Sequence, residues 1–505
     1  MTGRSTTADV CLLLEGSYPY VAGGVSTWVH DLLRAQSDLT FHLIALVADR
    51  TERPLCYEIP RNVVGLTPVF LQNPVLGERS FLDIAELFET IEPALIRIQQ
   101  GGTLSDVSLV LNRIGPYRDR LGRAVLLDSP IAWRTLCRMY EATVPNCSFL
   151  DYFWTWRSQL GGMFATLLSE LPPARVYHTV STGYAGLMAA RASLETGRPA
   201  IVTEHGIYTN ERRVEISMAD WLSDHEVAGL GIDKSTRNLR DLWIDTFVTY
   251  SRACYAACDK IITLYSGNQA MQRRDGAAPE RLAIIPNGVD YDSLSRIARD
   301  PAPRPPTIAL IGRVVPIKDV KTFIRTVAIL KTLVPDVVAL VMGPTEEDPD
   351  YFAECRDMVA QMSLGETLKF TGRVNLRDHL GSLDAIALTS VSEAQPLVIL
   401  EAGSVGVPTV ATDVGACREM VLGGPDEAPP LGAGGTITPL SNPAATAQAL
   451  AEFLLRPEWR KQCSEAIRQR VARYYNKQEI DQIYRNLYET YRAMPSREAP
   501  QLEVA

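Results

Sequence analysis

Two series of alternating apolar strands and amphipathic helices, separated by a proline-rich segment, constrain the fold of this chain most strongly. The first series opens with the apolar run Val10–Leu14, a glycine-containing loop, and a helix from about Val25 with apolar residues at helical spacing. Four prolines within residues 300–306 exclude regular helix or central strand there. The second series starts with the strand Thr307–Ile311 and the helix Asp319–Leu333. The pattern predicts an α/β protein with two Rossmann-like domains that face each other across a cleft.

The proline-rich segment also sets the predicted domain boundaries. We assign residues 1–300 to the first domain and 301–475 to the second, and we expect the helix and tail over 476–505 to pack back on the first domain. Residues from about 70 to 160 have helix-like patterns with several Trp and Tyr, and we interpret them as a helical insertion in the first domain.

Composition excludes some classes of protein. A formal net charge of -9 and the lack of a long Lys/Arg run argue against a nucleic-acid partner. No apolar stretch approaches the roughly 18 residues of a membrane span, and the N-terminus lacks a secretory pattern. The nine Cys include no CxxC pair, which is typical of reduced thiols in a cytosolic protein. For Cys254 and Cys258, one helical turn apart, buried thiols are a better interpretation than a metal clip. We expect a soluble, cytoplasmic protein.

Two glutamates separated by seven residues give the strongest chemical signal. Glu393 lies in a predicted loop, and Glu401 lies about one turn inside a helix that begins near Pro396. The free amides of Leu397 and Val398 and the positive end of the helix dipole suit a diphosphate. A carboxylate one turn along would repel phosphate but can accept two hydrogen bonds from a ribose diol. Glu393 can bind sugar hydroxyls or stabilise positive charge at the anomeric carbon. The alternative is two solvated glutamates around an ordinary helix start.

Two cations follow the first strand of the second domain. Arg313 and Lys318 should project at the carboxyl end of that strand, where they can hold a diphosphate and neutralise the charge of its departure. The alternative is that Lys318 pairs with Asp319 at a helix start. In the first domain, Gly23 and Gly24 would let a phosphate approach the backbone closely. Here the alternative is a tight turn that needs positive φ. The turn is neither a Walker loop nor G-x-G-x-x-G.

Histidines and a D-x-D sequence are further candidates. His205 follows a buried strand and can bond sugar hydroxyls at its carboxyl end, although a structural role is an open alternative. For His178 a structural role is favoured. Asp348 and Asp350 form a D-x-D that could bind Mg²⁺, but Asp350 is better interpreted as the cap of the next helix. We expect no metal, because Arg313 and Lys318 can neutralise the charge of the leaving diphosphate.

These features together resemble glycosyltransferase family 4. The resemblance is carried by AGG at 22–24, TEHG at 203–206, IPNGVD at 285–290, IGRVVPIKD at 311–319, FTGRV at 370–374 and the segment 390–420. It implies a GT-B fold, anomeric retention, and no essential metal or cofactor. It further implies the site residues. By this resemblance, Arg313 and Lys318 bind the diphosphate and Glu401 binds the ribose diol. The donor sugar is bound by Glu393, His205 and the backbone of Ala394, Gln395 and Pro396. The backbone around Arg373 and Val374 contacts the base, and the Gly23–Gly24 turn contacts the phosphate and sugar.

The segment Tyr18–Trp28 resembles a subgroup of that family that serves exopolysaccharide synthesis. This resemblance implies a UDP-sugar donor, with UDP-glucose as the first candidate, a carbohydrate acceptor, and a membrane-bound export complex that recruits the protein to the inner membrane. One departure concerns Ala394, Gln395 and Pro396, which stand where many family members have Gly-Phe/Tyr-Gly. Two alternatives stay open. One is a catalytically inactive nucleotide-sugar-binding module. The other is an NAD-dependent or epimerase-type enzyme, against which the absent dinucleotide fingerprint counts.

Overall fold

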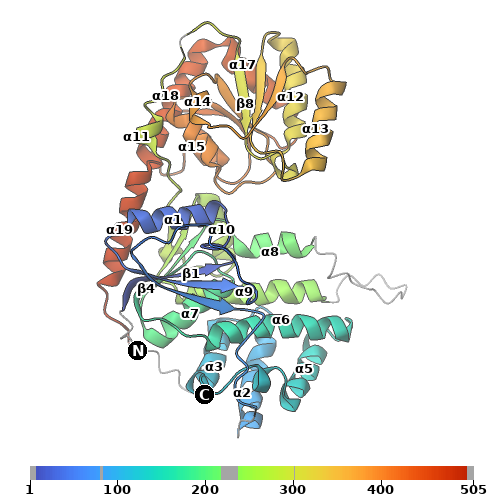
Figure 1. The fold of residues 1–505 in the computed structure, drawn as a ribbon, viewed down its shortest axis with the longest axis vertical. Coiled ribbons are helices and arrows are strands. Elements are labelled where there is room, and N and C mark those ends of the chain that lie inside the picture. Colours follow the sequence, from blue (N-terminus) through green and yellow to red (C-terminus); the bar gives the residue numbers. More distant parts are fainter. Residues whose placement is uncertain (1–6, 80–82, 218–236, 301, 498–505) are drawn as a thin grey trace. The chain divides into compact units, whose positions relative to one another are not determined.

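The chain folds into two compact units. The computed structural model describes residues 7–79, 83–217, 237–300 and 302–497 (Figure 1). Unit 1 consists of Met1–Thr263, Asn268–Ala283 and Tyr484–Ala505, and unit 2 consists of Leu264–Gly267 and Ile284–Ile483. Within the described ranges, no helix combines the length and the apolar character that a membrane span requires.

Unit 1 is built on a seven-stranded sheet in the order β3-β2-β1-β4-β5-β6-β7. Its strands are β1 (Ala8–Glu15), β2 (Phe41–Val47), β3 (Val63–Phe70), β4 (Ala174–Thr179), β5 (Ala200–Glu204), β6 (Lys260–Thr263) and β7 (Leu282–Ile284). From β3 to β6 neighbouring strands pair in parallel. Successive strands first extend the sheet on one side of β1 and then, from β4, on the other. The ends of β1 and β4 therefore form the switch point at which such sheets bind ligands.

Helices cover both faces of this sheet. Residues of β1 that point one way, Cys11 and Leu13, join a core cluster with α7 (Tyr184–Thr196) and α9 (Leu239–Ala257). Figure 1 shows α1 (Gly24–Ala35) and α7 on opposite sides of the sheet. Helix α8 (Tyr208–Ser217) and, from Asn268 on, helix α10 (Ser266–Arg274) also belong to this unit. Helices can pack on both faces because successive side chains of a strand point to opposite faces of the sheet.

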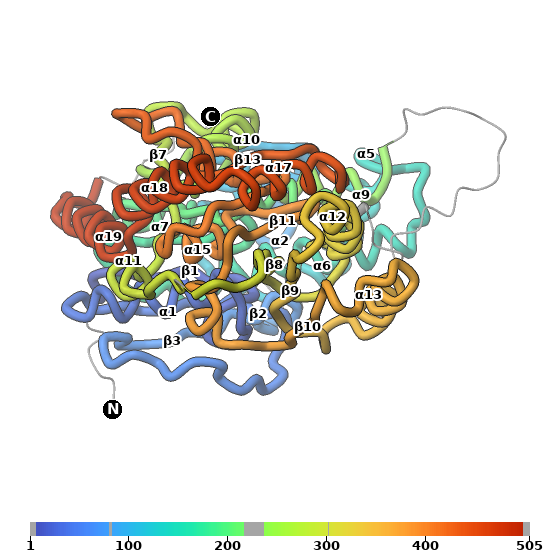
Figure 2. The backbone as a smooth tube through the Cα atoms, turned by 90° about the horizontal axis from the view of Figure 1, so that it is seen from above, coloured from blue at the N-terminus to red at the C-terminus, as the bar shows by residue number. Residues whose placement is uncertain are grey.

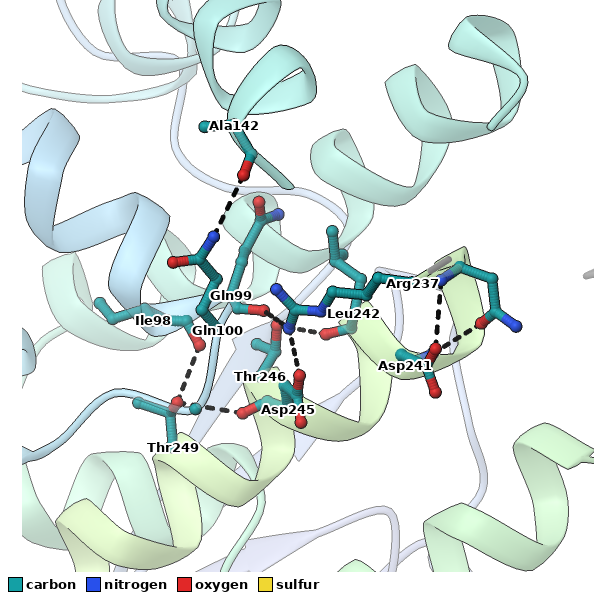
Figure 3. Close-up of polar contacts among 12 residues, drawn as sticks. Ile98, Gln99, Gln100, Ala142, Arg237, Asp241, Leu242, Asp245, Thr246 and Thr249 are labelled. Carbon is teal, nitrogen blue, oxygen red and sulfur yellow. Dashed lines mark hydrogen bonds and ion pairs between the residues drawn. The ribbon is translucent and has the colours of Figure 1, made fainter. Parts of the chain in front are cut away.

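The predicted helical insertion is confirmed between β3 and β4. It consists of α2 (Ile84–Ile98), α3 (Leu104–Ile114), α4 (Arg123–Leu126), α5 (Pro130–Thr143) and α6 (Phe149–Leu168). Polar contacts tie it to α9 (Figure 3). Thr249 donates its hydroxyl to the carbonyl of Ile98 at 2.8 Å, and Arg237 donates to the carbonyl of Gln99 at 2.7 Å. Both carbonyls stand at the end of α2, where helix geometry leaves them without intrahelical donors, so side chains near α9 complete them.

Unit 2 is built on a six-stranded parallel sheet in the order β10-β9-β8-β11-β12-β13 (Figure 2). Its strands are β8 (Thr307–Ile311), β9 (Val338–Met342), β10 (Leu368–Gly372), β11 (Ala385–Leu388), β12 (Thr409–Thr412) and β13 (Gly435–Thr438). The helices are α11 (Tyr291–Leu294), α12 (Val320–Leu333), α13 (Pro349–Gln361), α14 (Arg377–Leu380), α15 (Leu397–Ser404), α16 (Cys417–Leu422), α17 (Pro443–Leu455) and α18 (Pro457–Tyr474). Two parallel-sheet, Rossmann-like domains were predicted, and both are present. A cleft between them stays a prediction.

The central strand of unit 2 divides its core into two layers. Ile308 and Leu310 of β8 pack in one cluster with α12, α13 and α17, while Ala309 packs in the other with α15 and α16. Ala387 and Ile386 of the neighbouring β11 divide in the same way. Figure 1 shows α12 and α13 to one side of β8 and α15 to the other. Strands buried on both faces explain the continuous apolar runs in the sequence.

The units divide before the proline-rich segment, at Ala283/Ile284 and not at residue 300. The reason is that residues such as Val289 and Leu294 are buried in the core of unit 2. Helix α19 (Lys477–Arg492) belongs to unit 1 from Tyr484 on, in line with the expected packing on the first domain, whereas its residues up to Ile483 belong to unit 2.

Candidate active site

Three glycines at the carboxyl ends of neighbouring strands shape one side of the candidate site in unit 2. The amide of Gly312, after β8, donates to Met342, and the amide of Gly343, after β9, donates to Gly372 at the end of β10. A Cβ on Gly343 would lie 2.0 Å from the carbonyl oxygen of Gly312, so only glycine allows these two turns to approach this closely. The glycine turns at the ends of these strands therefore form the floor of the candidate site.

A hollow of about 230 Å³ opens over this floor. It is lined by Ile311, Gly312, Arg313, Met342, Gly343, Pro344, Arg373, Val374 and Leu376. Three predicted site residues, Arg313, Arg373 and Val374, thus share one hollow. The guanidinium of Arg313 pairs with Glu347, and Arg373 lies 3.7 Å from Glu346. All four side chains of these ion pairs are at least 48% exposed, so the pairs are weak and an anionic ligand can displace the acidic partner.

Lys318 and Glu393 meet at the switch point of this sheet. Lys318 follows β8 and Glu393 follows β11, and these two strands are neighbours in the sheet. From β8 the chain extends the sheet in one direction, and from β11 it extends the sheet in the other. Lys318 Nζ lies 2.6 Å from Glu393 Oε1, and the hydroxyl of Ser390 donates to the same oxygen at 2.6 Å. Both charged side chains are mostly buried, with exposed fractions of 22% and 11%. The alternative pairing of Lys318 with Asp319 is wrong, since Asp319 caps α12 by accepting from the amide of Thr322.

The loop that carries Glu393 is fixed by a second turn after β12. The amide of Ala416 donates to the carbonyl of Ala394 at 2.8 Å. Gly415 has φ of 51°, and a Cβ there would lie 2.0 Å from the carbonyl oxygen of Glu393. Both the conformation and the close approach therefore require glycine at this position.

The side chain of Gln395 binds the backbone of a distant segment of unit 2. Its side chain is 7% exposed, and its amide oxygen accepts from the backbone amide of Asn287 at 2.7 Å. The side-chain amide nitrogen of Gln395 donates to the backbone carbonyl of Asn287 at 3.4 Å. The side chain thus holds the IPNGVD segment. The backbone of this residue stays in the loop with Ala394 and the buried Pro396.

Helix α15 begins directly after this loop. Pro396 is its N-cap residue, so the amides of Leu397 and Val398 lie in the first turn, where helix geometry supplies no acceptor. Glu401 lies one turn further on. Burial raises the pKa of Glu401, and the positive charge of Arg377 partly opposes this shift. Arg377 donates to the hydroxyl of Ser293 at 2.5 Å.

In unit 1, the glycine turn lies between β1 and α1. Gly23 is extended, with φ of 171°, and Gly24 is the first residue of α1. A Cβ on either glycine would meet no atom within 4 Å. Neither backbone conformation nor packing within this unit therefore requires glycine, which argues against a tight turn with positive φ as the reason for the pair. The positive φ in this region belongs to Gly16.

The two histidines of unit 1 differ in their partners. His178 uses both ring nitrogens, with Tyr488 Oη at 2.7 Å and Thr203 Oγ1 at 2.9 Å, and is structural. His205 lies edge-on to the ring of Trp28, with centroids 4.7 Å apart, and its Nε2 is buried without a partner among the described residues. Burial lowers the pKa of His205 to about 4. At neutral pH it is an uncharged ring with one unused nitrogen.

The D-x-D sequence caps a helix, but not through the residue predicted. Asp348 is the N-cap of α13 and accepts from the amide of Tyr351 at 3.0 Å, while Asp350 lies in the first turn. Pro349 explains the shift, because proline suits the first helical position and places the cap one residue before it. Cys254 and Cys258 are buried, with their sulfurs 3.7 Å apart. Over the described ranges, no group of three or more His, Cys, Asp or Glu could hold a metal ion.

Each half of the chain matches a family of known proteins. A family model described as "Domain of unknown function (DUF3492)" matches residues 8–280, more than half of the 505 residues. The chain belongs to the DUF3492 family. Residues 295–470, which follow the DUF3492 region and contain the site of unit 2, match the model "Glycosyl transferases group 1". The predicted resemblance is therefore confirmed at the level of a group 1 glycosyltransferase domain.

Individual relatives match this DUF3492 protein in part. The D-inositol 3-phosphate glycosyltransferase of Saccharomonospora viridis is 28% identical over 252 residues, which are 46% of this chain and 54% of that protein. The chain spans about half the length of the curated relatives it matches.

Solved structures support the fold. Alr3699/HepE of Anabaena, solved in complex with UDP, has a TM-score of 0.58 at 14% identity, covering 95% of this chain and 99% of that one. Sucrose-phosphate synthase of Thermosynechococcus elongatus has a TM-score of 0.54 at 16% identity, with the same coverage of 95% and 99%. The two Rossmann-like units thus have the GT-B type of fold.

Proposed function

We propose that the protein is a retaining glycosyltransferase of family 4 that moves a hexose from a UDP-sugar, with UDP-glucose as the first candidate, to a growing exopolysaccharide. The observation that supports this most is the contact of Lys318 with Glu393 at the switch point of unit 2, beside the start of α15. A cation, a carboxylate and a helix N-terminus together suit a sugar diphosphate.

In this proposal each predicted residue keeps its role. The hollow with Arg313, Arg373 and Val374 takes the base and phosphates, and Glu401 takes the ribose diol. Lys318 stabilises the departing diphosphate. Glu393 and the backbone from Ala394 to Pro396 hold the sugar, and Leu397 and Val398 present their amides. From unit 1, Gly23, Gly24 and His205 contribute to phosphate and sugar binding. UDP in the related HepE structure supports a uridine nucleotide.

The reaction we propose is front-face displacement. The bond between the anomeric carbon and the β-phosphate oxygen breaks, and the acceptor oxygen bonds to the same face of that carbon. The acceptor proton passes to the departing phosphate, so the products are the glycoside and UDP. Lys318 and Arg313 compensate the charge that gathers on the diphosphate, so the proposal includes no metal ion or cofactor.

The Tyr18–Trp28 segment supports a finer assignment. It resembles PelF, the cytosolic glycosyltransferase of Pel exopolysaccharide synthesis, and we therefore propose a Pel-like polymer as product. The proposed setting is the cytoplasm, with recruitment to the inner membrane by a membrane-bound export complex. The partners proposed are thus this complex, the UDP-sugar and a carbohydrate acceptor.

A nucleotide-release assay tests the proposal. The purified chain is incubated with UDP-glucose, other UDP-sugars, ADP-glucose and GDP-mannose, and free nucleoside diphosphate is measured. We expect release of UDP, and we expect Lys318→Ala to lower the rate about 100-fold or more because one stabilising cation is lost. Arg313→Ala should lower it as well. Lys331→Ala, in the last turn of α12, is the matched control and should keep the wild-type rate.

Two outcomes contradict the proposal. Wild-type turnover in both Lys318→Ala and Arg313→Ala would refute the leaving-group role of these cations. Tight UDP-sugar binding with no release or transfer, even with oligosaccharide acceptors, would instead favour the inactive nucleotide-sugar-binding module.

A further inference from the structure

The Glu393–Pro396 loop is anchored at three successive residues. Glu393 contacts Lys318 and Ser390, and the carbonyl of Ala394 accepts from Ala416. The third anchor, Gln395, reaches the backbone of Asn287, a residue 108 positions earlier in the chain. Each anchor thus connects the loop to a different segment of unit 2.

The Asn287 segment is itself firmly placed. Its next residue, Gly288, packs so closely that a Cβ would lie 2.7 Å from Cα of Lys477. Val289 donates its amide to Tyr475, and Lys477 donates its amide to Val289, both at 2.9 Å, in a parallel bridge centred on Asn476. The segment is therefore a fixed support on which a neighbouring loop can be set.

A glutamine side chain suits this support for a chemical reason. The backbone of Asn287 offers one donor and one acceptor, and a primary amide offers the complementary pair. Both bonds to Gln395 are made by the backbone of Asn287. The side-chain oxygen of Asn287 takes no part in them and is buried without a partner in the described part of the chain. These bonds are costly to lose, because Gln395 is buried and the backbone groups of Asn287 would lose their partner at a partly buried site.

We infer that Gln395 is a positioning residue for the donor sugar, which sets the Glu393–Pro396 loop by holding the backbone of Asn287. The inference rests on the proposed function and deepens it. The loop faces the sugar in the proposed site, whereas the hollow with Arg313 takes the nucleotide. A loosened loop therefore weakens binding of the sugar part and leaves binding of the nucleotide part unchanged.

Three variants test this role. Gln395→Met keeps the length of the side chain and loses both hydrogen bonds, whereas Gln395→Glu keeps the acceptor for the amide of Asn287. Thr326→Val is the matched control, since it also removes a buried hydrogen bond of unit 2, from Thr326 to Thr322 within α12. For each protein we would measure KM and kcat for UDP-glucose, Kd for UDP, and amide hydrogen exchange without ligand.

We expect Gln395→Met to raise KM for UDP-glucose about tenfold, with a smaller change in kcat and Kd for UDP within about twofold of wild type. Exchange in peptides covering residues 285–290 and 391–396 should become faster. Gln395→Glu should recover part of the loss in KM, and Thr326→Val should match wild type in every measurement.

Each other outcome overturns the inference. Unchanged exchange in Gln395→Met would show that the side chain does not hold the loop. Faster exchange with an unchanged KM would show that the loop does not position the sugar. An equal loss in Kd for UDP would show a general structural defect of unit 2. A wild-type protein that releases no nucleotide from any sugar donor would refute the proposed function itself, whatever the exchange data show.

Discussion

Glu204 shows how a single side chain makes part of unit 1 sensitive to pH. It is fully buried at the end of β5 and accepts from Tyr255 at 2.6 Å, Gln272 at 2.8 Å and Thr182 at 3.2 Å. Burial raises the pKa of Glu204 to about 7, although these hydrogen bonds favour the charged form. The carboxyl group thus joins β5, α9 and α10 directly beside His205.

We predict that Glu204→Gln changes the pH dependence of stability in unit 1. The folded pKa lies above the unfolded value, so between about pH 4.5 and pH 7 the folded protein binds more protons and its unfolding free energy falls as pH rises. The slope has an upper limit of about 1.4 kcal/mol per pH unit. Glutamine carries no such proton, so the variant should gain stability relative to wild type from pH 5 to pH 8.

Urea unfolding followed by tryptophan fluorescence checks this, because five of the described Trp residues belong to unit 1, namely Trp28, Trp133, Trp154, Trp156 and Trp243. If the unfolding midpoints of both proteins change with pH in parallel, Glu204 does not carry the effect.

At the scale of elements, the turns after β8 and β9 depend on their close approach. We predict that Gly343→Ala destabilises unit 2 by about 1–3 kcal/mol, because its Cβ would overlap the carbonyl oxygen of Gly312. Amide exchange in peptides from β8 and β9 should become faster. The matched control is Gly365→Ala, where a Cβ would meet no atom within 4 Å. Equal exchange in the two variants would contradict this account of the floor.

The sequence predicted elements well where both faces of a strand are buried. The apolar runs of β1 and β8 are clear because both faces of these strands are buried, and the pattern of α12 is clear because only one face of this helix is apolar. Strand β3 was not predicted, since it is mostly half-buried at the sheet edge and contains Pro68. Edge strands tolerate such residues, and a mixed pattern resembles a loop.

The candidate site was predictable to a similar extent. Lys318 and Glu393 were identified because charged residues after adjacent buried strands must gather at one sheet edge. The partner of Gln395 was not predictable, because it is the backbone of Asn287, and backbone groups carry no sequence signal. The pairing of Arg313 with Glu347 depends likewise on side-chain directions that spacing does not determine.

For the whole molecule, the division of α19 between the two units has a consequence for stability. Tyr484 lies edge-on to Trp28 with ring centroids 5.3 Å apart, and Tyr488 bonds His178 and packs on Phe41. Both tyrosines are almost fully buried. Unit 1 is therefore completed by residues that follow unit 2 in the chain.

We predict that a chain ending at Ile483 loses stability in unit 1 by several kcal/mol, because two buried aromatic side chains each contribute about 1.5–3 kcal/mol. Amide exchange in β1 and β2 should become faster, while β8 and β9 keep their protection. Uniform loss of protection in both units would show that α19 supports the molecule as a whole and not unit 1 in particular.

This chain order has a consequence during biosynthesis. Domains commonly fold one after another as the ribosome delivers them, with the N-terminal one first. Here Trp28 of α1 and His178 of β4 gain the contacts of Tyr484 and Tyr488 late, because these tyrosines leave the exit tunnel only after most of unit 2. Until then the nascent chain presents an uncovered aromatic surface, and α19 completes the domain that began to fold first.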